Sequence, residues 1–143
     1  MRSIAIPLIL AALAAPAAAQ SAMDLVPGLY GSANDPATSC TANPHRLDVT
    51  GPRPHVELTW AQPAEDPEAG ATLHSRYDVL TADPGSIALR REGSNLRADG
   101  GGQVIWIMRL TSTPDGYCWG RADRAIVYCE RPQIRCGDAA PIS

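Results

Sequence analysis

Residues 103–136 read QVIWIMRLTSTPDGYCWGRADRAIVYCERPQIRC, and this stretch decides the fold. It holds three of the four cysteines and two of the three tryptophans of the chain. Runs 104–110, 117–121 and 125–129 are typical of β-strands, and turn-forming polar residues separate them. The pattern predicts a β-meander that is held together by disulfides.

The N-terminus has the pattern of an export signal. A single arginine precedes an apolar run that is too short to span a bilayer, and three alanines then precede Gln20. We therefore expect residues 1–19 to be a signal peptide. We expect residues 20–143 to form one disulfide-stapled β domain, with an ordered core of about residues 25–136 and no membrane span.

The charge of the chain limits its partners. The formal net charge is −3, and such a mildly acidic balance argues against nucleic acid or an anionic membrane as the main partner. We expect the partner to be a protein or a small apolar ligand, and the domain to be a monomer in the periplasm or outside the cell.

The four cysteines of an exported chain predict two disulfides, each contributing about 2–4 kcal/mol. No Cys-X-X-Cys spacing occurs, so the sequence indicates neither a zinc ribbon nor a redox centre. Two pairings are open. Either Cys118 pairs with Cys129 and Cys40 with Cys136, or Cys129 pairs with Cys136 and Cys40 with Cys118.

Strand signals also recur about every ten residues before the meander. They lie near Tyr30 and at residues 45–50, 55–60, 76–81 and 86–91. No segment has a sustained helical period. The sequence predicts an all-β antiparallel meander of seven to eight strands, which is either a small barrel or a two-sheet sandwich, and we prefer the barrel.

Two segments before the meander are predicted to lie outside the strands. Residues 20–23 are expected to lack fixed structure. Residues 62–70 carry three acidic residues and two prolines, which predicts an exposed acidic loop.

The sequence contains no catalytic or metal-binding pattern. His45, His55 and His74 each lie beside a turn without metal-ligand spacing, so we expect surface histidines. No Gly-X-Ser-X-Gly nucleophile motif occurs, and the acidic segment lacks the alternating oxygen ligands of calcium loops. We expect a protein that is not an enzyme and that needs no metal or cofactor.

The candidate binding residues lie on the first two predicted strands of the meander. Tyr117, Trp119 and Arg121 share one face by parity. An arginine on an aromatic face is either a structural lid over the core or an anchor for a ligand carboxylate. Trp106 and Arg109 complete the candidate set, although an arginine in the position of Arg109 commonly extends to the surface.

Gly28-Leu29-Tyr30 and Arg121 together resemble the lipocalin pattern. Lipocalin-like barrels open with a Gly-X-Trp strand and close with an arginine that packs over that tryptophan, and here Tyr30 takes the place of the tryptophan. The resemblance implies a barrel in which Arg121 lies over Tyr30. The chain is shorter than most lipocalins, which argues against a large enclosed cavity.

Two functions follow from these patterns. The first is an exported, non-catalytic small β-barrel binding module, such as an inhibitor or an envelope interaction protein. The alternative is a small-molecule carrier of lipocalin type. A filled core favours the first, and a pocket of several hundred cubic ångströms favours the second. The expected pocket residues are Trp60, Tyr77, Trp106, Tyr117 and Trp119.

Overall fold

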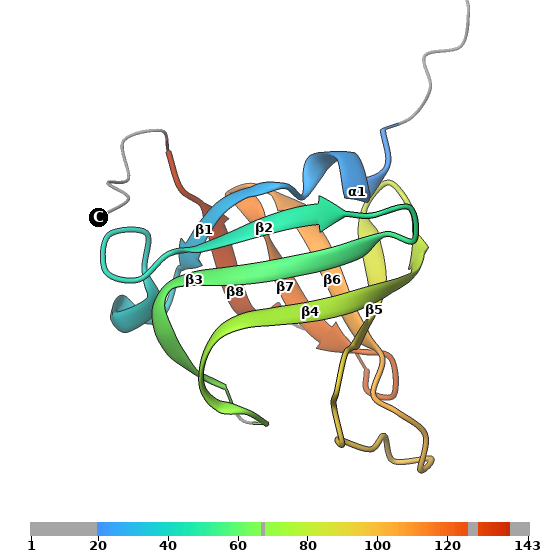
Figure 1. Cartoon of the computed structure of the whole chain (residues 1–143). Coiled ribbons are helices and arrows are strands. Elements are labelled where there is room, and N and C mark those ends of the chain that lie inside the picture. The colour runs from blue at the N-terminus through green and yellow to red at the C-terminus, as the bar shows by residue number, and fades with distance from the viewer. Residues whose placement is uncertain (1–19, 67, 126–128, 138–143) are drawn as a thin grey trace, which may run out of the picture.

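Eight antiparallel strands close into a barrel in the computed structural model, which describes residues 20–66, 68–125 and 129–137 (Figure 1). Each strand pairs with its neighbours in the sequence, and β8 closes the barrel against β1. The strands are β1 Gly28–Ser32, β2 His45–Thr50, β3 His55–Asp66, β4 Gly70–Ala82, β5 Ser86–Arg91, β6 Trp106–Ser112, β7 Asp115–Arg121 and β8 Glu130–Arg135. The predicted all-β barrel is confirmed, and the predicted signal peptide lies outside the described residues.

The core fills the barrel because alternate residues of each strand point inward. Leu47, Val56, Ile87, Leu89 and Met108 are fully buried. The register places Ile87 opposite Met108 across β5 and β6, so large side chains meet inside the barrel. Burying each such side chain contributes about 1.5–3 kcal/mol.

The disulfides resolve the two open pairings in favour of the first. Cys40 is bonded to Cys136, and Cys118 is bonded to Cys129. Cys40 lies so close to Gly31 of β1 that a Cβ at that glycine would collide with the Cys40 backbone. This disulfide therefore fastens the loop after β1, which contains the short 3-10 helix η1 (Pro36–Thr38), to the end of β8.

The prediction of a loop at residues 62–70 is wrong, although most of the described residues in this segment are exposed, as expected. β3 continues to Asp66 and β4 begins at Gly70, so the segment extends a long hairpin. Pro63 is tolerated because it falls where the register shifts between Thr59 and Ala64, and a proline needs no ladder hydrogen bond at such an irregularity.

The last strand also differs from the prediction. The expected run was 125–129, of which 126–128 lie outside the described residues, and the observed strand is β8. Proline and charged residues give β8 no local strand signal. It forms because β1 and β7 pair with its two edges, with Ile134 opposite both Gly31 and Gly116.

One end of the barrel is closed by the N-terminal helix α1 (Ala22–Leu25). Ser21 forms a capping box with Asp24, and the Ala22 amide donates to the Asp83 carbonyl over 2.9 Å. Ala22 and Val26 are fully buried against the core. The expectation that residues 20–23 lack fixed structure is therefore wrong, because these contacts order them.

Arg135, rather than Arg121, packs over Tyr30. Its guanidinium carbon lies 4.8 Å from the ring centre, and it donates to the carbonyls of Leu25 and Pro27 over 2.6 and 3.0 Å. Gly28 leaves the necessary room, because a Cβ there would collide with Arg135. The implied position of Arg121 is wrong because β7 carries it to the opposite end of the barrel.

Candidate functional site

The end of the barrel opposite α1 is open. The long β3–β4 hairpin and the loop 92–105 extend from this side of the barrel (Figure 1). Together with residues 122–125, which follow β7, they frame what we call the mouth. Two cavities lie within it, and Trp119 and Arg131 line both.

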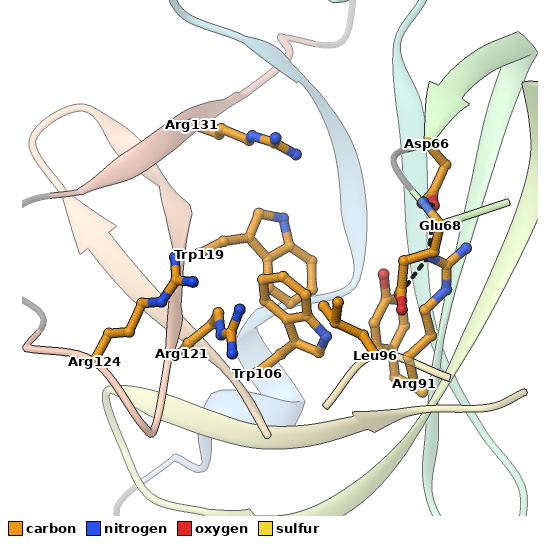
Figure 2. Close-up of a pocket in the computed structure, with 10 residues that line it drawn as sticks. Asp66, Glu68, Arg91, Leu96, Trp106, Trp119, Arg121, Arg124 and Arg131 are labelled. Atoms are coloured by element: carbon orange, nitrogen blue, oxygen red, sulfur yellow. Dashed lines mark hydrogen bonds and ion pairs between the residues drawn. The ribbon is translucent and has the colours of Figure 1, made fainter. Parts of the chain in front are cut away.

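The smaller cavity has a volume of about 270 Å³ and combines aromatic rings with charged side chains (Figure 2). Alternation directs the aromatic residues of β4, β6 and β7 inward. The lining residues are Asp66, Glu68, Tyr77, Arg91, Leu96, Trp106, Trp119, Arg121, Arg124 and Arg131.

Three rings form the aromatic wall of the smaller cavity. The rings of Trp106 and Trp119 meet edge to face, with centres 6.2 Å apart, and Tyr77 lies 5.5 Å from Trp119. Burial raises the pKa of Tyr77 to about 12, so its hydroxyl stays neutral at physiological pH. Neither tryptophan is fully buried, so the cavity gives access to their rings.

Arg91 fastens the tip of the β3–β4 hairpin to the barrel wall. It donates to Asp66 over 2.6 Å and to Glu68 over 3.0 Å. Burial alone would raise the pKa of Asp66. The hydrogen bonds from Arg91 and from the backbone amides of Glu68 and Ala69 outweigh burial, so the pKa lies below its usual value. Asp66 is therefore charged, and both acids are paired with Arg91.

Arg121 is held by Asp123 in the connection after β7. Two hydrogen bonds of 3.0 and 2.7 Å join the guanidinium to the carboxylate, and they lower the pKa of Asp123 to about 2. Asp123 also accepts the backbone amide of Asp99 over 3.1 Å, which ties the loop 92–105 to this connection. Arg121 thus has a structural role at the rim.

Arg124 and Arg131 differ from the other two arginines. Both line the smaller cavity, and no carboxylate among the described side chains pairs with either. Their guanidinium groups approach the two tryptophans from the side opposite Arg91 (Figure 2). Four arginines and two acids line this cavity, which gives it two excess positive charges.

The larger cavity has a volume of about 520 Å³ and lies over the ring cluster of the core. Its floor includes His45, whose Nε2 lies 2.5 Å from the Tyr117 hydroxyl and whose ring centre lies 4.5 Å from that of Trp60. Burial lowers the pKa of His45 to about 4, so it is neutral at physiological pH. The expectation of a surface histidine is wrong for His45, which is 1% exposed. Its position at the start of β2, opposite Trp60 of β3, turns it inward.

Three buried polar atoms of residues that line the two cavities have no hydrogen-bond partner among the described atoms. They are Nε1 of Trp106 in the smaller cavity, and Nδ1 of His45 and Oε1 of Gln133 in the larger one. Buried polar groups are nearly always paired in folded proteins.

The structure separates the five predicted binding residues. Trp106, Trp119 and Arg121 line the smaller cavity, and Tyr117 lies buried beneath the larger one. Arg109 is exposed on the outer surface of β6 and borders neither cavity. The five aromatic residues expected in a pocket all line one of the two cavities.

Sequence reasoning did not find Arg91, Arg124, Arg131 or His45. Arg91 had a usable signal, because it shares the inward parity of Ile87 and Leu89. The position of Arg131 follows from the pairing of β8, which has no local signal. The candidate site thus combines residues that are readable from parity with residues that only strand pairing brings in.

Among the described residues, no group of three histidine, cysteine or acidic side chains could hold a metal ion. No helix in the same part of the chain has the length and apolar character needed to cross a membrane. The chain matches no known protein-family model, and neither the curated proteins nor the solved structures contain a significant match to it.

Proposed function

We propose that the protein is an exported, non-catalytic binding module that holds a small ligand in the mouth of its barrel. The observation that carries this proposal is the contrast within the barrel. The core between the mouth and α1 is filled by fully buried side chains, whereas the mouth holds two cavities with unpaired polar atoms.

The unpaired atoms support binding rather than packing alone. An unsatisfied buried donor or acceptor costs about 1–3 kcal/mol of stability. If the mouth had only a structural role, replacing each such polar group with an apolar one would stabilise the fold. A ligand would recover this free energy by pairing with Trp106 Nε1 or with Gln133 Oε1, which requires neighbouring side chains to shift because both atoms are buried.

The cavities favour the small-ligand form of the module over a flat face for a protein partner. Both are concave, and each has aromatic side chains with a few polar groups, as small-molecule sites do. The larger cavity, at about 520 Å³, has the size expected of the alternative, a small-molecule carrier of lipocalin type, and the fully buried core beneath it places the ligand near the rim in either case.

Export is part of the proposal. Two disulfides and the absence of free cysteines among the described residues fit an oxidising compartment outside the cytosol. The disulfides also favour a rigid site, which lowers the entropy cost of binding.

The proposal is tested by a thermal-shift screen of the oxidised protein against a library of small metabolites. Ligands of the mouth should raise the melting temperature of the wild type and of the control Arg109→Gln, which alters the outer surface. They should act weakly or not at all on Trp106→Ala. The proposal would be refuted if the hits raised the melting temperature of Trp106→Ala as much as that of the wild type. Chemical turnover of a hit, detected by mass spectrometry, would also refute it.

A further inference from the structure

We propose that the smaller cavity selects an organic anion with a flat aromatic body. The body would lie against Trp106 and Trp119, and the anionic group would be bound by Arg124 and Arg131. This inference names the ligand class for the mouth and rests on the proposed function.

The charge of the cavity opposes that of the chain. The chain carries a formal net charge of −3, yet the lining of this cavity has four arginines against two acids. The two acids are both bound by Arg91, and Arg121 is bound by Asp123. The excess positive charge therefore resides on Arg124 and Arg131.

The polar groups of the smaller cavity without a described partner are mainly donors, and the Tyr77 hydroxyl can both donate and accept. An indole N–H only donates, and a guanidinium offers five N–H donors and no acceptor. The carboxylates of Asp66 and Glu68 are already engaged by Arg91, and Glu68 also accepts from Ser94 over 2.6 Å. The excess of donors favours a ligand that supplies acceptors, and a carboxylate or sulfonate supplies them with the complementary charge.

The two unpaired arginines are suited to one anion. Both extend toward the tryptophans from the same side of the cavity (Figure 2). The planar guanidinium recognises carboxylates in a bidentate manner, and it also stacks on aromatic rings.

The size and walls of the cavity indicate a small ring system. Its volume of about 270 Å³ lies just below the range of roughly 300–1,000 Å³ that is typical of drug-sized ligands. Trp106 and Trp119 meet edge to face, so a flat ring can contact the face of one and the edge of the other. A body of one or two fused rings matches this space.

The test compares 2-naphthoate with 2-naphthamide, which have the same ring system and nearly the same shape but differ in charge. Calorimetric titration of the oxidised wild-type protein should show naphthoate binding at least tenfold more tightly. The naphthoate affinity should also fall as salt is added, because salt screens the ion pair. Equal affinities would overturn the inference without any variant.

The variant Arg124→Gln/Arg131→Gln should lower the naphthoate affinity to that of naphthamide. Arg109→Gln is the matched control and should keep the full preference for naphthoate. Trp119→Ala should lower the affinity of the protein for both compounds. A preference that survives the double arginine variant would overturn the assignment of the anion site.

The failures of the inference and of the proposed function are distinguishable. If both compounds bind equally and both are lost on Trp119→Ala, anion selection is refuted while binding in the mouth stands. If neither compound binds, the aromatic-anion class is refuted, and the metabolite screen with Trp106→Ala decides the proposed function separately.

Discussion

The closed end and the mouth of this barrel use the same pair of residue types, arginine and an aromatic ring, to different effect. At the closed end, Arg135 lies on Tyr30 and donates to Asp115 and to two backbone carbonyls of the N-terminal segment. In the mouth, Arg124 and Arg131 approach Trp119 without a carboxylate partner among the described side chains. An arginine stabilises the fold where the chain supplies acceptors, and it is available to a ligand where the chain supplies none.

The largest expected loss of stability comes from removing the Cys40–Cys136 disulfide, which joins the two ends of the domain. Cys40 and Cys136 are separated by 96 residues, and loop-closure entropy predicts a loss of about 4–5 kcal/mol when both become alanine. The Cys118–Cys129 pair spans 11 residues, so its removal should cost about 3 kcal/mol. Chemical denaturation of the two double-alanine variants measures both values. A larger loss for the Cys118–Cys129 variant would contradict this account.

The second prediction compares one aromatic residue from each end. Tyr30 is fully buried and donates to the Val26 carbonyl over 2.8 Å, so Tyr30→Ala should cost about 3–5 kcal/mol. Trp119 is only partly buried and lines both cavities, so Trp119→Ala should cost about 2 kcal/mol and should mainly reduce ligand binding. Equal losses of stability would show that the mouth is as tightly packed as the closed end.

The third prediction concerns pH and His45. Its pKa is lowered to about 4 by burial beside Tyr117, against a usual value of about 6.5 in the unfolded chain. Between pH 6.5 and pH 4, His45 is therefore protonated in the unfolded chain but not in the folded one. The contribution of neutral His45 to the free energy of unfolding is complete above pH 6.5 and is lost as the pH falls toward 4. The loss should reach about 3 kcal/mol.

The control for His45 is His45→Gln, which can still hydrogen-bond to Tyr117 but does not titrate. Its unfolding free energy should depend less steeply on pH between 6.5 and 4 than that of the wild type. Parallel pH dependences for the two proteins would show that His45 is not the group responsible.

The smallest expected effect contrasts the arginines of the two ends. Arg135→Gln should cost about 1–2 kcal/mol, because it removes hydrogen bonds from a charged group to the Leu25 and Pro27 carbonyls. Arg124→Gln/Arg131→Gln should change stability by less than about 0.5 kcal/mol, since neither side chain has an ion pair with a described residue. Thermal unfolding in parallel tests the difference, and a strongly destabilised mouth variant would argue for a structural role there.

Much of the fold was predictable because its signals are local. Alternation at 55–60 and 86–91 gave strands with the observed inward faces, and parity placed Tyr117, Trp119 and Arg121 on one inner face. The N-terminal helix was missed because a helix of four residues has no period to detect. The extension of β3 through Pro63 was missed because the proline falls at a register shift, which the sequence does not show.

The sequence by itself determined the β class, the inward aromatic residues and the presence of two disulfides, because alternation and cysteine content are properties of short segments. Only the tertiary structure decided which arginine meets which partner. Pairing of β1 with β8 brings Arg135 onto Tyr30, and pairing of β7 with β8 brings Arg131 into the mouth. The physical reason is that closing a barrel joins strands from the two ends of the chain, and the register of that closure depends on packing across the whole core.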